Sequence, residues 1–417
     1  MRSKSYVSVV WVIVAAAALI GCGGSSNSSN KPKPTGLKKR VLLTNVQSNT
    51  INLLDAQKDV VSTKTFGATA PTKIITAGGQ TVVLNSSQPT FSIIDNTTEQ
   101  VTFTPLLNDV AFDVALTPDG KTAFLAERNS NTIQSATTAD GGVSPASIIV
   151  PTPRRLVMSP KGTRLLIFSD PQAGTTNAFF IIDTSSKGII EVTSANLDQP
   201  ITAVFGATDD QAFILNCGPE CGGTTASVVQ VNFSGVFANP QVPATVSTPI
   251  NLNGGGATVG LLNGSSLFVA GTPPTFPAIT CPLSRCGTLN VINTSSLSAS
   301  APVAITDGLH QKMAFVNNRV YVGATGCTVD AGTAANTVRG CLSIFNTTSS
   351  GVVFPLESSF RQNFDVTGLQ PISNRSVTYV VQGGELDIFD ATTDARATGI
   401  TQIDIFGKAI DVVQIDP

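Results

Sequence analysis

The stretch Phe91-Ser92-Ile93-Ile94-Asp95-Asn96-Thr97-Thr98 reads as a short apolar strand that ends in an acid and a polar turn. The same motif recurs along the chain, and repetition at this spacing predicts a propeller or a solenoid. Clear copies are Ile51–Asp55, Phe179–Asp183, Leu289–Asn293, Leu342–Asn346 and Leu386–Asp390, with a weaker copy at Val228–Asn232 and a degenerate one at Gln134–Thr138.

The residue pattern of this repeat explains why we predict a buried strand followed by a turn. The first and third positions are apolar and share one face of a strand, because successive side chains alternate. The fourth position of the clear copies is also apolar and covers the other face, which suits a sheet stacked between two neighbouring sheets. The closing Asp or Asn can bond the backbone two residues on and start a turn. We therefore interpret acids such as Asp95 as turn residues rather than ligands.

The apolar runs from Arg40 onward fall into groups of four strands, and the composition is that of an all-β protein. A tight turn such as Pro118-Asp119-Gly120 separates the first and second strands of a group. The predicted second strands are Val41–Asn45, Thr81–Asn85, Thr122–Glu127, Arg164–Ser169, Gln211–Asn216, Ser266–Ala270, Arg319–Gly323 and Val377–Gln382. The predicted first strands begin near Thr72, Asp113, Arg154, Ile201, Ala257, Gln311, Leu369 and Ala409.

The chain begins on a second strand and ends on a first strand, Ala409 to Ile415. Pairing these two strands would close a ring and remove its exposed edges. We therefore predict an all-β fold, a β-propeller of four-stranded antiparallel blades whose C-terminal strand joins the N-terminal blade. The count favours eight blades, and seven is the alternative because the third group is degenerate.

Three phrases resemble the bacterial YVTN-type propeller repeat, which is related to the lactonase-like seven-bladed propellers. They are FSIIDNTTEQVTFT at 91–104, LLTN at 42–45 and TPDGKTAFLAE at 117–127, although Leu42 stands where the namesake motif has tyrosine. The resemblance covers nearly all of residues 40–417 and implies the fold. Lactonase-like enzymes use acids, arginine or histidine around the channel, and no such set can be matched residue by residue here.

The N-terminus has the pattern of an export signal. Arg2 and Lys4 precede an apolar run from Val7 to Ala18, and Leu19-Ile20-Gly21-Cys22 then resembles the bacterial lipobox. We expect a lipoprotein signal peptide over 1–21, lipidation of Cys22, a disordered tether over 22–39 and the propeller over 40–417. An ordinary secretory signal is the alternative. The expected location is the bacterial cell envelope, with the outer membrane or cell surface favoured over the inner membrane.

The six remaining cysteines lie in local pairs, and an exported chain retains disulfides. We predict three bonds, Cys217–Cys221, Cys281–Cys286 and Cys327–Cys341, from among the 15 possible pairings of six cysteines. Zinc is disfavoured because His310 is the only histidine. Nucleic acid is disfavoured as a partner because the chain carries 25 Lys and Arg against 27 Asp and Glu. We expect no cofactor, because no cofactor-binding motif is found.

All three cysteine pairs fall in long connections between second and third strands, near 216–226, 270–287 and 323–341. Long loops without secondary structure are usually functional or disordered, and cross-links oppose disorder. The alternative is that the pairs only stiffen drifted insertions. Candidate binding residues in these loops are Phe276, Arg285, Asp330 and Arg339.

Other candidate sites have weaker support from the sequence. Asp307 and His310 lie close in sequence and form a possible acid–base pair. A cation site is conceivable at the acids that precede first strands, although strand-start turns also explain them. These acids are Asp109, Asp198, Asp307 and Asp365.

The function that these features favour is an envelope-anchored module that binds a protein or glycan through its loop-rich face. The first alternative is a lactonase-like or lyase-like enzyme with Asp307 and His310 at the channel mouth. The second is a structural scaffold in envelope assembly.

Overall fold

The computed structural model describes residues 33–170, 177–252, 255–275 and 280–416. The compact unit begins at Thr35 and runs to the C-terminus. The expected signal peptide and Cys22 lie outside the described residues. Within the described residues, no helix is long and apolar enough to cross a bilayer.

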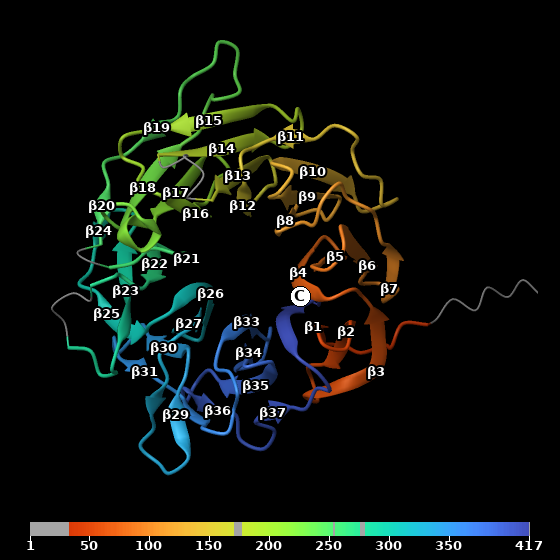
Figure 1. Cartoon of the computed structure of the whole chain (residues 1–417), viewed down its shortest axis with the longest axis vertical. Helices are drawn as coiled ribbons and strands as arrows, with labels where there is room; N and C mark the ends of the chain where they lie inside the picture. Colours follow the sequence, from red (N-terminus) through yellow and green to blue (C-terminus); the bar gives the residue numbers. More distant parts are fainter. Residues whose placement is uncertain (1–32, 171–176, 253–254, 276–279, 417) are drawn as a thin grey trace, which may run out of the picture. The chain divides into compact units, whose positions relative to one another are not determined.

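Antiparallel β-sheets make up almost the whole compact unit, and Figure 1 shows them placed around a common centre. Eight sheets have four or five strands, and a ninth has three. In each of the eight sheets, one inner strand lies against the inner strands of the neighbouring sheets. The inner strands are β38 (Ala409–Gln414), β4 (Pro71–Ala77), β8 (Asp113–Leu116), β12 (Pro153–Met158), β16 (Pro200–Phe205), β21 (Val259–Asn263), β26 (Leu309–Val316) and β33 (Val366–Pro371).

The second and third strands of the sheets carry most of the buried apolar residues. The second strands are β1 (Arg40–Asn45), β5 (Gln80–Asn85), β9 (Thr122–Glu127), β13 (Arg164–Ser169), β17 (Gln211–Asn216), β22 (Ser266–Gly271), β27 (Arg319–Thr325) and β34 (Val377–Gln382). The third strands are β2 (Thr50–Asp55), β6 (Thr90–Asp95), β10 (Thr132–Thr137), β14 (Ala178–Asp183), β18 (Ser227–Asn232), β23 (Cys286–Asn293), β30 (Leu342–Asn346) and β35 (Glu385–Asp390).

Most of the outer strands are short, although β3 (Val60–Gly67) has eight residues, and three of the sheets split the outer strand into two pieces. They are β3 (Val60–Gly67), β7 (Gln100–Phe103), β11 (Ile148–Ile149), β15 (Ile189–Thr193), β19 (Thr245–Val246) with β20 (Ile250–Asn251), β24 (Ser298–Ala299) with β25 (Val303–Thr306), β31 (Val352–Val353), and β36 (Ala395–Arg396) with β37 (Gln402–Ile403). The separate three-stranded sheet consists of β28 (Asp330–Ala331), β29 (Thr337–Arg339) and β32 (Leu356–Ser358).

The repeat that predicted the fold buries both of its faces. Phe91 and Ile93 of β6 pack in a cluster with residues of the next sheet, such as Leu125. Ile94 points the other way and packs with residues of the preceding sheet, such as Leu53. The alternation of apolar positions therefore has the predicted cause, a sheet that lies between two others.

The acid that closes the repeat starts a turn, as predicted. Oδ1 of Asp95 accepts hydrogen bonds from the amides of Thr97 and Thr98, at 2.7 and 2.9 Å. Asp183, Asn293, Asn346 and Asp390 make the same kind of bond to amides two or three residues on. These residues start the turn after the third strand in five of the sheets.

The two ends of the compact unit meet in one sheet. Strand β38 is antiparallel to β1, with Leu42 opposite Val413 and Leu43 opposite Val412. Thr35 donates hydrogen bonds from its amide and its hydroxyl to Glu99, in the turn between β6 and β7. The segment before β1 therefore already contacts the sheets from Thr35 onward, although the sequence placed the end of the tether at residue 39.

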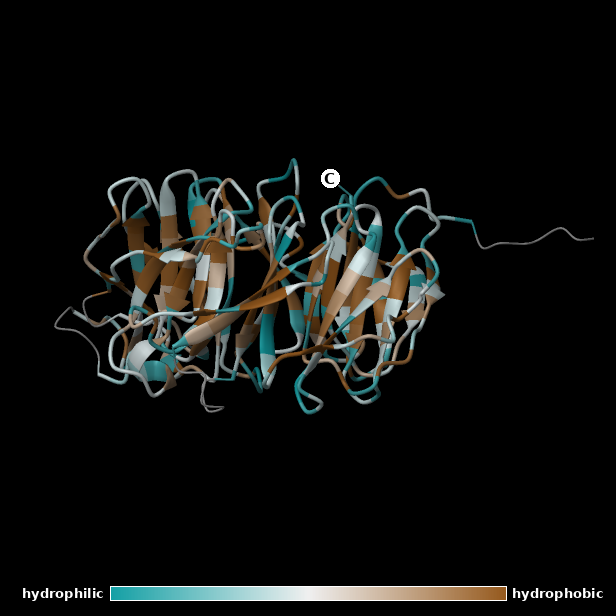
Figure 2. Cartoon of the chain, turned by 90° about the horizontal axis from the view of Figure 1, so that it is seen from above, coloured by the Kyte–Doolittle hydropathy of each residue, from teal (hydrophilic) through white to brown (hydrophobic). Residues whose placement is uncertain are grey.

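Connections between strands lie on two opposite rims of the sheets, which Figure 2 views edge-on. One rim carries the turns within first–second and third–fourth strand pairs, and Thr35 meets the sheets there. The other rim, which we call the loop face, carries the connections between second and third strands and those that lead to the next inner strand. The three insertions that carry the cysteine pairs belong to the loop face, whereas the long connection between the third and fourth strands over residues 233–244 lies on the opposite rim.

Candidate functional site

The three predicted disulfides, Cys217–Cys221, Cys281–Cys286 and Cys327–Cys341, are all present on the loop face. The first closes a short 3-10 helix, Gly218–Cys221, and the third closes the loop that carries β28 and β29. Each bond therefore holds one of the long insertions at its base.

Hydrogen bonds join these three insertions to one another. The amide of Thr272 donates to Glu220 Oε2 at 2.8 Å, which links the first insertion to the second. The amide of Ser284 donates to Asp330 Oδ1 at 3.1 Å, which links the second to the third. We call the joined segments 217–226, 272–275, 280–285 and 326–341 the loop platform.

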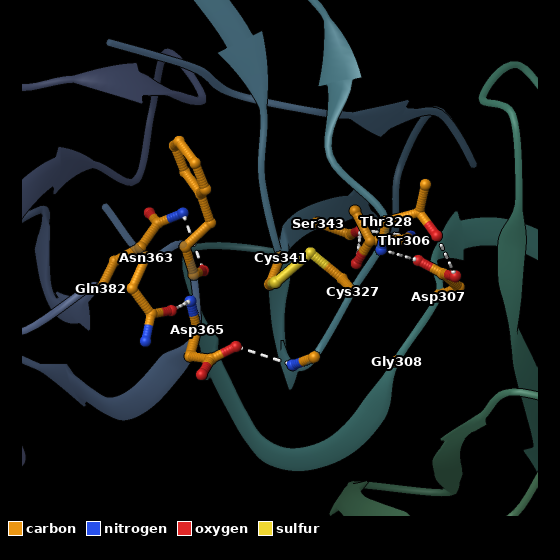
Figure 3. The surroundings of a disulfide bond; sticks show 12 residues. Thr306, Asp307, Gly308, Cys327, Thr328, Cys341, Ser343, Asn363, Asp365 and Gln382 are labelled. Carbon is orange, nitrogen blue, oxygen red and sulfur yellow. Dashed lines mark hydrogen bonds between the residues drawn. A yellow bond between two sulfur atoms is a disulfide. The ribbon is translucent and has the colours of Figure 1, made fainter. Parts of the chain in front are cut away.

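Acids that precede inner strands fix the loop platform from below. Asp198 accepts hydrogen bonds from the amide and hydroxyl of Thr224, both at 2.7 Å, and from the amide of Thr225 at 2.8 Å. Asp307 binds Thr328, and Asp365 accepts a hydrogen bond from the amide of Gly326 at 2.6 Å. Figure 3 shows Asp307 and Asp365 on either side of the Cys327–Cys341 bond.

These contacts place the four predicted acids at separate loops rather than around one ion. Asp109 accepts a hydrogen bond from the amide of Val110 at 2.7 Å and lies in a different connection from the other three. Within the described ranges, no group of three or more histidine, cysteine or acidic residues has the geometry of a metal site. The structure thus gives the acids a positioning role on the loops.

His310 lies beneath the platform and is 1% exposed. Its Nε2 is 2.9 Å from the carbonyl oxygen of Thr306, and burial lowers its pKa to about 4. The Asp307 carboxylate turns to Thr328 instead, and no hydrogen bond between Asp307 and His310 occurs in the described residues. His310 is consequently a neutral, packed side chain near neutral pH.

The predicted binding residues have different surroundings. The side chain of Arg285 is 68% exposed and its Nε lies 3.8 Å from Asp307 Oδ2. Arg339 donates to the carbonyl of Ala331 at 2.8 Å and so braces the β28–β29 pair. Asp330 joins two insertions, and Phe276 lies outside the described residues. Arg285 is the member of this set that remains free to meet a partner.

A buried charge network, which the sequence did not predict, holds the third insertion. Asp387 of β35 is fully buried and accepts hydrogen bonds from Arg361 at 2.6 Å and from Arg396 at 2.7 Å. Arg396 also binds Glu357 of β32, which is 2% exposed. This network ties the three-stranded sheet to the sheet of β33–β36.

A charged cavity at the centre of the loop face was also not predicted from the sequence. A cavity of about 330 Å³ lies among the inner strands, with Lys73, Arg154 and Lys312 in its wall. A second cavity of about 530 Å³ shares Arg154 and reaches Glu220 and Cys221 of the platform. The available signal was a basic residue near the start of several inner strands, in Thr72-Lys73, Arg154-Arg155 and Gln311-Lys312.

No family model matches this chain, and no curated protein matches it. Many solved structures share its fold. The dihydro-heme d1 dehydrogenase NirN, solved in complex with DHE, is 8% identical with a TM-score of 0.63, over 92% of this chain and 78% of that one. Apo AztD from Citrobacter koseri is 10% identical with a TM-score of 0.60, over 90% and 97%.

BamB from Moraxella catarrhalis is also 10% identical, with a TM-score of 0.50, over 88% of this chain and 93% of that one. At these identities the likeness concerns the fold alone. The neighbours are bacterial β-propellers, and the chain described here therefore has a β-propeller fold.

Proposed function

We propose that this chain is an envelope-anchored β-propeller that binds a partner protein through the loop platform. The single observation that carries this proposal is the linkage of three insertions by disulfides and by the Glu220–Thr272 and Asp330–Ser284 contacts. Such cross-links hold a surface in one shape before binding, which lowers the entropic cost of association.

The surface chemistry of this region suits a protein partner. Arg285, Val329 and Phe360 lie on the loop face with exposed side chains, and Phe360 is 80% exposed. Arginine and aromatic residues are enriched at protein interfaces. A glycan partner is the alternative ligand.

The arrangement of the propeller supports an exposed loop face on an anchored protein. Thr35 meets the sheets on the rim opposite the loop face. In this proposal, the segment that carries an acyl chain on Cys22 joins the compact unit at Thr35. Mass spectrometry of membrane-extracted protein is expected to show an acylated N-terminal cysteine, and a soluble form with an unmodified N-terminus would contradict the anchor.

We also propose eight blades, with the ring closed by β38. The eight sheets of four or five strands and the antiparallel pairing of β38 with β1 support this count and this closure. The three-stranded sheet is then an insertion of one blade, because β29 and β32 flank its third strand β30 in sequence.

A photo-crosslinking residue at Val329 or Phe360 tests the binding role in cells. Both positions should give a discrete cross-linked product, which mass spectrometry identifies as protein or glycan. The matched control is Val242, which is 51% exposed and lies in a third–fourth strand connection on the opposite rim. The same product from all three positions, or none from the loop face, would refute the proposal.

The two rival functions predict different results in cross-linking and in an activity assay. An enzyme would hydrolyse lactones and lose that activity in Asp307→Asn or His310→Ala, with no cross-linked partner. A scaffold of envelope assembly would cross-link an assembly component and show the same product in every growth condition.

A further inference from the structure

The cavity at the mouth of the central channel is lined by more cationic than acidic side chains. Four cationic and two acidic side chains line the cavity of about 330 Å³, although the whole chain carries more acids than cations. The cations are Lys73, Arg154, Arg155 and Lys312, and the acids are Asp113 and Asp411.

Each acid is already paired with a lysine and with the backbone of a neighbouring blade. Asp113 binds Lys73 through one oxygen and the amide of Leu156 through the other, the latter at 2.8 Å. Asp411 pairs with Lys312 at 2.7 Å. The two lysine charges are therefore compensated inside the protein.

The two arginines have no such compensation. Neither the side chain of Arg154 nor that of Arg155 makes a hydrogen bond or ion pair with any of the described residues. Asp170 attracts Arg154 electrostatically, but its carboxylate is bound to Arg128. Burial lowers the pKa of Arg154, and the adjacent charge of Arg155 adds to this effect. Two neighbouring guanidinium groups thus remain unpaired in a partly enclosed cavity, which costs free energy unless an anion joins them.

A third group in the same wall also lacks a partner. The hydroxyl oxygen of Thr367, near the start of β33, is buried and makes no hydrogen bond among the described residues. Buried polar atoms without a partner are uncommon in native proteins and call for an explanation. A ligand in the cavity would supply that partner.

We propose that the channel mouth binds a small oxyanion with two negative charges, held by Arg154 and Arg155 and hydrogen-bonded by Thr367. Two guanidinium groups offer paired donors that match carboxylate or phosphate oxygens. The cavity volume is that of a small-molecule site. Arg154 also lines the cavity that reaches the loop platform, but the anion site does not depend on the protein-binding proposal and is tested without a protein partner.

Calorimetric titration of the folded chain (residues 35–417) with inorganic phosphate, and separately with succinate, tests this inference at low ionic strength. Wild-type protein should bind at least one of the two probes at a single site. Binding of phosphate alone indicates a phosphate ligand, and binding of succinate alone indicates a dicarboxylate. Absence of binding by both probes would overturn the proposal.

Single substitutions test which residues bind the anion. Arg154→Gln and Arg155→Gln should each weaken binding by about tenfold or more, because a hydrogen bond to a charged group is lost. Thr367→Val should weaken it by a smaller factor. Lys58→Gln, which removes an exposed cation on the opposite rim, is the matched control and should bind like the wild type.

A second measurement separates lost binding from lost folding. Without ligand, Arg154→Gln should melt at the same or a higher temperature than the wild type, because an unpaired, partly buried charge is removed. With the probe that binds, the wild type should gain melting temperature and the variant should not. Equal gains in both proteins would place the anion elsewhere and refute the site.

Discussion

The carboxylate of Asp307 accepts hydrogen bonds from both the amide and the hydroxyl of Thr328, at 2.6 and 2.8 Å. Asp307 precedes β26, and Thr328 follows Cys327 in the third insertion. Asp198 and Thr224 repeat this arrangement beside the Cys217–Cys221 bond. An acid at the start of an inner strand and a disulfide therefore fix two of the insertions together.

Asp307→Ala should loosen the third insertion while leaving the propeller folded. The substitution leaves two donors of Thr328 without their acceptor, at a cost of about 1–3 kcal/mol. Hydrogen exchange of residues 326–341 should accelerate, and exchange of residues 217–226, which Asp198 holds, provides the internal control. Unchanged exchange in 326–341 would show that the disulfide alone fixes this loop.

The strands could be predicted from the sequence because their residues are buried on both faces. All eight predicted second strands coincide with strands of the structure to within two residues. The acids that close the third strands could be assigned to turns, because an Asx turn involves only neighbouring residues. The disulfides could be predicted because each pair is local in sequence.

The charged sites could not be predicted in the same way because their members come from distant strands. Lys73 and Lys312 belong to different blades and meet only at the channel mouth. Asp387 has the position of a solvent-facing polar residue in its strand, yet the three-stranded sheet covers it and supplies Glu357. The residues around Asp387 in the sequence do not indicate that a sheet distant in sequence buries it.

Deletion of residues 409–417 should destabilise the propeller by about 4 kcal/mol or more. The deletion removes the buried residues Ala409 and Val412 together with the ladder to β1, and it exposes the edge of that strand. Denaturant unfolding and light scattering provide the measurement. Deletion of residues 22–34, which precede the compact unit, is the control and should leave the unfolding midpoint unchanged. A truncated protein that unfolds like the full chain would contradict the role of β38.

Asp387→Asn should cost about 3–5 kcal/mol, because it breaks a buried ion network and leaves charge unpaired. Arg361 and Arg396 both lose the Asp387 carboxylate, at 2.6 and 2.7 Å in the intact protein, and share only Glu357 afterwards. Thermal unfolding measures the cost. Asp119→Asn is the matched control, since the side chains of Asp119 and Lys121 are 54% and 81% exposed, and its effect should stay within about 0.5 kcal/mol. Equal effects of the two substitutions would refute the structural role of the network.

The contribution of Glu220 to the stability of the protein should fall as the pH rises from about 5 to about 7. Burial raises the pKa of Glu220 to about 7, and the hydrogen bond from the Thr272 amide only partly opposes this effect. The folded state therefore holds a proton that the unfolded state releases near pH 4.5, and this stabilisation is lost as the carboxyl ionises. The full shift corresponds to about 3 kcal/mol, and partial exposure of the side chain reduces this to about 1–2 kcal/mol.

Unfolding free energies at pH 5 and pH 8 measure this effect, and Glu220→Gln identifies its source. His310 acts in the opposite direction over part of this range, because burial lowers its pKa from 6.5 to about 4 and only the unfolded state takes up its proton there. The comparison of the two proteins removes this contribution, which both share. The stability of the wild type relative to Glu220→Gln should therefore be lower at pH 8 than at pH 5, because glutamine stays neutral throughout. A difference between the two proteins that is the same at both pH values would show that the Glu220 carboxyl is ionised throughout.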